Sequence, residues 1–297
     1  METYINQFTF NKDELSSVSD STVKNIIVRL EEGHVIYLSN MAFSLNSHEE
    51  SFLSPHIIDS SAKNISYYPL TRQLRGCTHL PPRQKLLLLL MMERYYHFAK
   101  HLIITLLPQY ALALEIGRTS YRPVEVKGRP SSYRKDDSLL HVDAFPSMPV
   151  QGRRILRVFS NVNPSHEPRV WNIGEPFSHV IDRFVPSLKK PKPMMASLLK
   201  TFHITKGERT PYDHYMLHLH NDMKADGDYQ RNVKKETMPF PPHTSWIVFT
   251  DKTSHAALTG QYLLEQTFYL PIHAMNDEQC SPLRLLENKL QHPLLTF

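Results

Sequence analysis

The chain has 297 residues, of which 41% are hydrophobic, and carries a formal net charge of +5. This composition indicates a folded protein rather than a disordered one, and the length allows one large domain or two smaller ones. The 22 prolines against 9 glycines favour many turns, and neither G-x-G-x-x-G nor G-x-x-x-x-G-K occurs, which excludes glycine-rich nucleotide loops.

Two sequence features bear on the cellular compartment. The cysteines Cys77 and Cys280 are few and far apart, which favours a reducing environment over a disulfide scaffold. The N-terminus lacks a basic segment followed by an apolar run, and the apolar stretch at residues 86–92 is too short to cross a bilayer. We therefore expect a cytoplasmic protein.

Residues 1–117 read as a mixed, largely helical support region. An amphipathic segment at 23–30 precedes a predicted strand at 34–38. The strongest helix signal covers residues 83–107, because it follows two prolines, contains no breaker and ends at Pro108. Leucines surround nearly the whole of this helix, which predicts that it is buried against a sheet.

From about residue 118 to 275 the pattern changes to short β-prone runs separated by proline, asparagine and aspartate. A helical insert is expected at about 205–235, and the tail at 276–297 has no firm signal. We predict one domain over 1–297, mainly β with flanking helices (α+β) and with the many short strands of a jelly roll. The expected core strands are 139–145, 153–161, 169–173, 245–250, 255–258 and 262–270.

The most specific chemical signal is the tripeptide His141-Val142-Asp143, followed much later by His255. In a strand, residues two apart lie on the same face, so His141 and Asp143 would present an imidazole and a carboxylate side by side. Two histidines and one carboxylate with open positions form the facial triad of non-haem Fe(II) oxygenases. The alternative is that His141 and Asp143 are an ordinary pair of surface residues that binds no metal. The apolar neighbours of this segment indicate burial, however, and burying a carboxylate without a partner is costly.

Other histidines compete for a metal role. His214 and His218 have helical i, i+4 spacing, but no glutamate follows His214 as H-E-x-x-H requires. We therefore interpret them as helix-surface or interface residues.

Basic residues concentrate between positions 118 and 169. Such a field attracts anions, so nucleic acid, an anionic membrane, a phosphate- or carboxylate-bearing substrate, or an ordinary solvated face all remain open. Nucleic acid is the weakest of these, because no aromatic platform motif is interleaved with the basic residues.

The stretch from residue 133 to 177 carries a family resemblance. It contains RKDD, LHVDAFP, GRRILRVFSNVNP and RVW followed by GEPF, and later segments at 211–226 and 245–257 extend the match. These strings resemble the Kdo hydroxylases, Fe(II)/2-oxoglutarate-dependent dioxygenases that act on 3-deoxy-D-manno-oct-2-ulosonic acid (Kdo) of lipopolysaccharide. The resemblance covers most of the chain and is strongest from about 120 to 270.

The resemblance implies a double-stranded β-helix, a cupin-like jelly roll, with iron held by His141, Asp143 and His255. It implies hydroxylation at C3 of Kdo on Kdo-lipid A to give the sugar Ko, with release of succinate and CO2. Fe(II), the co-substrate 2-oxoglutarate and ascorbate are the expected cofactors. Because the lipid lies in the inner membrane, transient peripheral contact with that membrane is also expected, with Arg83, Lys85 and the 86–92 run as contacts; a buried core helix is the competing interpretation.

One departure from the wider pattern concerns the co-substrate. Many 2-oxoglutarate enzymes carry a basic residue about ten positions after the distal histidine, and here residues 260–267 contain none. Arg157, or else Arg154, is the predicted partner of the far carboxylate, with Gln266 as a neutral donor. Strand alternation places Arg157 and Arg154 on opposite faces, without indicating which face points inward. The predicted cationic rim for the substrate consists of Arg129, Arg134, Lys135 and Arg153.

Two other functions remain open from sequence. The chain could be a 2-oxoglutarate-dependent hydroxylase of another substrate, or a non-catalytic jelly-roll binding protein whose triad holds a structural ion.

Overall fold

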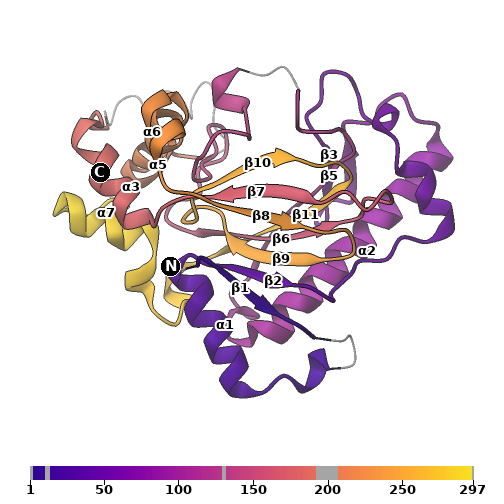
Figure 1. The fold of residues 1–297 in the computed structure, drawn as a ribbon, viewed down its shortest axis with the longest axis horizontal. Helices are drawn as coiled ribbons and strands as arrows, with labels where there is room; N and C mark the ends of the chain where they lie inside the picture. The colour runs from indigo at the N-terminus through magenta and orange to yellow at the C-terminus, as the bar shows by residue number, and fades with distance from the viewer. Residues whose placement is uncertain (1–2, 11–13, 129–131, 192–206, 296–297) are drawn as a thin grey trace.

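The computed structural model describes residues 3–10, 14–128, 132–191 and 207–295, and shows two β-sheets flanked by helices (Figure 1). Within this part of the chain, the larger sheet contains β1 (Ile5–Phe8), β2 (Val35–Leu38), β3 (Ile65–Tyr68), β4 (Gln73–Arg75), β5 (Glu115–Arg122), β6 (Arg154–Asn161), β9 (Ser245–Phe249) and β11 (Leu263–Leu270). The smaller sheet contains β7 (Arg169–Ile173), β8 (Glu236–Phe240) and β10 (His255–Thr259). The strand orders are β1-β2-β9-β6-β11-β5-β3-β4 and β10-β7-β8, and the paired strands are antiparallel apart from β1 with β2.

The two sheets share an aromatic core. Alternate residues of each strand point to the same face, so one face of β6, β9 and β11 meets one face of the smaller sheet. Trp246 stacks on Phe159 and on Phe240, with ring centroids 5.2 and 4.0 Å apart. Phe159 and Trp171 of this core also line the cavity described below, so the core and the cavity adjoin between the sheets.

Two helices cover the opposite face of the larger sheet: α1 (Asp20–Glu32) and α2 (Pro82–Leu106). The predicted helix at 83–107 is confirmed as α2. The expectation that it is buried against a sheet is confirmed for one face, where Leu88 and Met91 are buried, while Leu86 and Leu90 are 56% and 44% exposed. A single sheet can bury only one face of the helix.

The other α-helices in the described part of the chain gather at one end of the sheets (Figure 1). The predicted insert is confirmed as two helices, and its capping box joins Thr210 and Asp213. The tail forms a further helix, capped by Ser281 ahead of Pro282, although its sequence gave no firm signal. These helices are α3 (Phe177–Phe184), α5 (Pro211–Ala225), α6 (Gly227–Asn232) and α7 (Pro282–Leu290).

The region before residue 118 is more than a helical support. It supplies β1 and β2 at one edge of the larger sheet, and β3 and β4 at the other. Strands β5 and β8 were not expected, and the segment predicted as a strand at 139–145 makes only an isolated bridge between His141 and His255. In the described ranges, no helix has the length and apolar character needed to span a membrane.

Candidate metal centre and cavity

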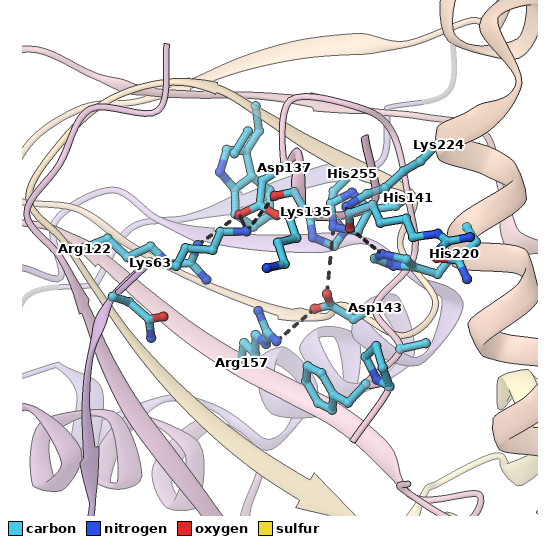
Figure 2. A pocket seen from close by; sticks show the side chains of 18 of the residues that line it. Lys63, Arg122, Lys135, Asp137, His141, Asp143, Arg157, His220, Lys224 and His255 are labelled. Carbon is cyan, nitrogen blue, oxygen red and sulfur yellow. Dashed lines mark hydrogen bonds and ion pairs between the residues drawn. The ribbon is translucent and has the colours of Figure 1, made fainter. Parts of the chain in front are cut away.

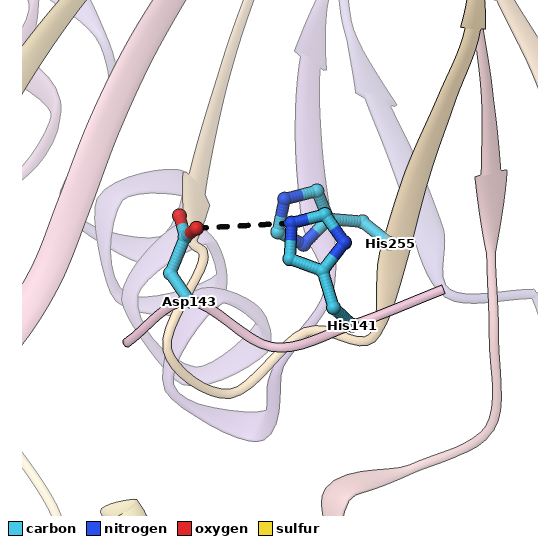
Figure 3. A group of neighbouring side chains, drawn as sticks. All are labelled: His141, Asp143 and His255. Carbon is cyan, nitrogen blue, oxygen red and sulfur yellow. Dashed lines mark ion pairs between the residues drawn. The ribbon is translucent and has the colours of Figure 1, made fainter. Parts of the chain in front are cut away.

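His141, Asp143 and His255 lie together between the two sheets (Figure 3). Two reciprocal backbone hydrogen bonds join the histidines: His141 N donates to His255 O at 3.0 Å, and His255 N donates to His141 O at 2.9 Å. Asp143 N donates to Thr250 O at 2.8 Å. These backbone bonds bring the two segments of the predicted triad together, and one potential ligand atom from each of the three side chains lies within 4.8 Å of the others.

Both imidazoles are oriented through Nδ1. The Nδ1 atoms lie 2.7 Å from Leu139 O for His141 and 2.9 Å from Thr253 O for His255, contacts that require an Nδ1–H donor. Nε2 of each ring is then free to bind a metal. Burial lowers the pKa of both histidines, and for His141 the neighbouring His255 adds to this effect, so both rings are neutral as metal ligation requires.

Aromatic rings hold the two histidines from either side. The Trp171 indole stacks on His255 with centroids 5.0 Å apart and an interplanar angle of 24°. His220, from α5, meets His141 edge to face at 5.0 Å, and its Nδ1 lies 2.9 Å from Val142 O between two of the triad residues. These contacts restrict both imidazoles to the orientation that faces Asp143.

A chain of charged side chains leads away from Asp143 and begins with its ion pair to Arg157 (Figure 2). The Arg157 guanidinium lies 3.1 Å from Asp143 Oδ2 and 3.3 Å from Glu265 Oε1. Arg122 then bridges Glu265 at 2.7 Å and Asp137 at 3.1 Å. Arg157 and Asp143 form a close ion pair without a well-aligned hydrogen bond, because Oδ2 has no hydrogen-bond partner among the described residues.

This network keeps Asp143 ionised. Burial alone would raise the pKa of Asp143, but the positive charge of Arg157 outweighs it and holds the pKa well below its usual range. Two neutral imidazoles and one carboxylate are a donor set suited to ferrous iron, so the residues present fit the predicted metal.

The same network predicts acid sensitivity of the fold. Burial would raise the pKa of Glu265, but Arg157 and Arg122 hold it below the usual value of 4.5. A carboxyl group with a lowered folded pKa contributes stability above its unfolded pKa, and this contribution is lost as the pH falls through the folded value. We expect stability to decrease steeply below about pH 4, and less steeply in Glu265→Gln. Calorimetric unfolding from pH 6 to pH 2 measures both slopes, and equal slopes would contradict the assignment.

The triad opens into a cavity of about 790 Å³ between the sheets (Figure 2). Its acidic lining residues are Asp137 and Asp143. The basic ones are four times as many. They come from both sheets, from the loop before β3, from the 3-10 helix η5 (Tyr133–Lys135) and from α5. They are Lys63, Arg118, Arg122, Arg134, Lys135, Arg157, Arg169 and Lys224. A cavity with this balance attracts anionic ligands.

Comparison with known proteins shows which family the chain belongs to. A family model of Kdo hydroxylases matches residues 13–293. The chain belongs to the Kdo hydroxylase family. The cobalt(II) complex of the Kdo hydroxylase KdoO is 43% identical, with a TM-score of 0.94 over 98% of this chain and 97% of that chain. The complex of KdoO with 2-oxoglutarate and Fe(III) is 42% identical, with a TM-score of 0.92 over 97% of each chain.

A comparison with curated proteins finds no match. The family predicted from the HVDAFP and RILRVFSNVNP strings is confirmed, as is the enzyme class: a non-haem Fe(II)/2-oxoglutarate-dependent dioxygenase. The fold is correspondingly that of a β-rich 2-oxoglutarate oxygenase with added helices.

The predicted co-substrate residues of this Kdo hydroxylase divide between the two faces of the larger sheet. Arg157 points into the cavity. Arg154 is fully buried on the other face, where it pairs with Asp251 at 2.7 Å. Gln266 is also buried there and accepts a hydrogen bond from Thr119 at 2.5 Å. Because Arg154 and Gln266 lie outside the cavity lining, we correct both predictions.

The predicted rim residues are also separated. Arg134 and Lys135, in η5, line the cavity. Arg153 does not; it pairs with Glu115 and lies over the Tyr269 ring, which corrects its assignment as a substrate contact. Arg129 falls outside the described residues.

Several cavity residues of this family member were missed. Lys63, Lys224 and His220 reach the cavity from a loop and from α5, far from the triad in sequence. Arg169 was visible only as the first letter of the RVW string. The helical spacing of His220 and Lys224, four residues apart, was the one signal that could have paired them on a single helix face.

Proposed function

We propose that this chain is the Kdo 3-hydroxylase predicted from its sequence. It would use Fe(II), 2-oxoglutarate and O2 to convert C3–H of Kdo on Kdo-lipid A to C3–OH, giving Ko, succinate and CO2. The observation that carries the proposal is a buried, neutral-histidine and carboxylate triad at the inner end of a cavity rich in cations. We further infer a double-stranded β-helix, since the 141 bridge adds a fourth member to the smaller sheet beside β10.

In this proposal His141, Asp143 and His255 hold the iron. Ferrous iron bound there supplies oxygen activation coupled to oxidative decarboxylation of 2-oxoglutarate. The protein's own part is positional: the Leu139 and Thr253 carbonyls fix the two imidazoles, while the cavity walls hold the substrate carbon and exclude competing reactions. Ascorbate is kept as an additional cofactor, to be tested by its omission from the assay.

We assign Arg157 a positioning role rather than the co-substrate contact predicted from sequence. Its guanidinium lies between Asp143 and Glu265, so two buried carboxylates already balance its charge. Arg157 lies beside Asp143 Oδ2, which leaves Oδ1 for the metal. Residues that contact a metal-binding carboxylate from behind commonly orient it in this way.

The basic residues at the outer part of the cavity would bind the acidic sugar. Arg134 and Lys135 lie in η5, and Lys224 approaches the same turn from α5, donating to Arg134 O at 3.2 Å. A Kdo carboxylate and the phosphates of lipid A are anions that guanidinium and ammonium groups bind well.

Charge reversal in this turn tests the substrate site. We expect the double variant Arg134→Glu/Lys135→Glu to raise KM for Kdo-lipid A by about tenfold or more at low ionic strength, with a smaller effect at high salt. The control is Lys24→Glu/Lys100→Glu, which changes net charge equally on α1 and α2, outside the cavity lining. Equal KM values for the two double variants would contradict the assignment.

The decisive test of the function is oxygen incorporation. Purified enzyme, Fe(II), 2-oxoglutarate and Kdo-lipid A under ¹⁸O2 should give a product that is one labelled oxygen heavier, with the label on Kdo. Mass spectrometry that shows 2-oxoglutarate consumption but no labelled Kdo would favour another substrate. Absence of any 2-oxoglutarate turnover with all substrates would favour the metal-holding binding protein.

Membrane contact is part of the proposal because the substrate is a lipid. The support is the exposed pair Leu86 and Leu90 on α2, near Arg83 and Lys85 at the start of the same helix. Together with the two free cysteines, this favours a cytoplasmic enzyme that binds the inner membrane peripherally. Salt-sensitive binding to anionic vesicles, weakened in Leu86→Ser/Leu90→Ser, is the expected result.

A further inference from the structure

The backbone segment that carries His141 and Asp143 has one edge that no described strand covers. The edge toward β10 is bonded, because His141 N and O both pair with His255. In extended backbone, the peptide groups of successive residues point alternately to opposite edges. The groups of Leu140 and Val142 therefore point away from β10, and among the described residues no β-strand pairs with them.

The side chain of Gln230, on α6, takes the place of a strand at this edge. Leu140 N donates to Gln230 Oε1 at 2.8 Å, and Gln230 Nε2 donates to Leu140 O at 2.9 Å. A carboxamide carries a donor and an acceptor as a peptide group does, so these two bonds reproduce the exchange between paired strands. Nε2 also donates to Met223 O at 2.8 Å, near the end of α5. Both amide hydrogens and the amide oxygen are thus used.

The bonds of Gln230 are formed where water has little access. Leu140 is 1% exposed and Met223 is 0% exposed. A buried backbone donor or acceptor that loses its partner costs more free energy than the bond itself contributes. Removing the amide of Gln230 would take away the partner of Leu140 N and that of Leu140 O. We therefore expect this part of the backbone to shift or loosen when the amide is absent.

Helix α6 also contacts the segment of the second histidine. Tyr229 is fully buried, and its hydroxyl lies 3.3 Å from Oγ of Ser254, the residue before His255. Consecutive residues of α6 thus contact the residues that precede the two triad histidines. The start of α6 is fixed by its N-cap, because Tyr229 N donates to Asp226 Oδ1 at 2.9 Å. This cap positions the side chains of both Tyr229 and Gln230.

A residue of α5 supports the next group along the same edge, but in a different way. His220 Nδ1 lies 2.9 Å from Val142 O. His220 also lines the cavity and meets the His141 ring, so replacing it would change the cavity and the triad directly. Gln230 does not line the cavity. Its contact with the triad segment runs through the backbone of Leu140, which makes Gln230 the residue on which support of the metal centre can be tested separately.

We propose that Gln230 is a positioning residue for the metal centre. Its amide holds the backbone of Leu140, and so keeps His141 and Asp143 facing His255 before a metal binds. The inference rests on the proposed function, in which these three residues hold the iron. Direct outer partners of metal ligands contribute about 10- to 100-fold to metal affinity. Gln230 acts one residue away from a ligand, so we expect an effect near the lower end of this range.

The test is anaerobic Co(II) binding to the intact chain, measured by calorimetry and by the d–d absorption bands of the bound ion. Gln230→Met keeps a side chain of similar length and removes the amide. We expect the affinity of this variant for Co(II) to fall by about tenfold. The d–d bands of the saturated variant should also differ from those of the wild type, because the ligands are held less firmly. Lower stability alone would not change the spectrum of the folded, metal-loaded protein.

The control is Gln266→Met, the same change at a buried glutamine on the other face of the larger sheet. The Gln266 amide accepts from Thr119 and donates to Thr267 O, away from the triad. This variant should unfold at a lower urea concentration and keep the wild-type affinity and spectrum. Wild-type affinity and spectrum in Gln230→Met, or an equal loss of affinity in Gln266→Met, would overturn the inference and leave the proposed function intact.

Two further outcomes are separated by measurements on the wild type. If the wild type does not bind Co(II), the metal triad of the proposed function fails together with the inference. Should Gln230→Met not fold, residue-resolved hydrogen exchange of the metal-free wild type decides. We expect the Leu140 amide, which donates to Gln230, to be protected as strongly as the His141 amide, which donates to His255. Fast exchange at Leu140 would overturn the inference.

Discussion

Replacing His255 by alanine is expected to abolish 2-oxoglutarate-dependent oxygen incorporation and to weaken metal binding by more than about 100-fold. The reason is that outer partners of metal ligands alone contribute about 10- to 100-fold to affinity, and a ligand itself contributes more. His141→Ala and Asp143→Ala should behave in the same way, since the three side chains offer the donor atoms that lie within 4.8 Å of one another.

Anaerobic Co(II) or Fe(II) titration and single-turnover assays measure the two effects separately. Circular dichroism checks that the fold is retained. The control is His218→Ala, a histidine on α5 that does not line the cavity. Full activity in any one of the three triad variants would refute the metal site.

The Arg157→Met variant is expected to lose about 3–5 kcal/mol of unfolding free energy, because it removes one partner from a buried charge network. Glu265, which is 0% exposed, would keep Arg122 as its ion-pair partner among the described residues, and Asp143 would lose the cation that holds its pKa low. Metal affinity should fall in the same variant and become more sensitive to acid, because Asp143 must be ionised to bind.

Urea unfolding of the apo protein measures the loss of stability. The matched control is Arg153→Met, four residues earlier in the sequence, where a more exposed ion pair with Glu115 should contribute less than about 1 kcal/mol. Equal losses in the two variants would show that the charge network around Arg157 contributes no more than a surface pair.

Two residues of the triad could be predicted from local sequence information, whereas His255 lies much later in the chain and was supported by the family resemblance. His141 and Asp143 share a face by simple alternation, and the apolar residues around them indicate burial. Strands β2, β6, β7, β9, β10 and β11 were predicted from short β-prone runs between turn residues, whereas β1, β3, β4, β5 and β8 were not. Strand β5 was missed because Arg118 and Arg122 point toward the cavity and interrupt the hydrophobic pattern of an inner face. Strand β8 contains Pro239, which is tolerated because β8 is an edge strand.

The residues around the triad were harder to predict because their roles depend on partners from other elements. Alternation along β6 separated Arg154 from Arg157 correctly, but only the packing of α1 and α2 decides which face is inward. Arg153 and Arg134 read alike in sequence, and a glutamate on β5 decides that Arg153 pairs at the surface. The position of Arg169 on the cavity wall likewise depends on the folded arrangement, which no spacing in the chain expresses.

The reciprocal hydrogen bonds between His141 and His255 affect how the enzyme responds to loss of its metal ion. Small zinc domains acquire their shape only when the ion arrives, and so they unfold when it is removed. Here two neighbouring peptide groups set the spacing of the imidazoles in advance. We therefore expect the site to keep its shape when iron is lost. A new ion could then bind without refolding of the polypeptide around it.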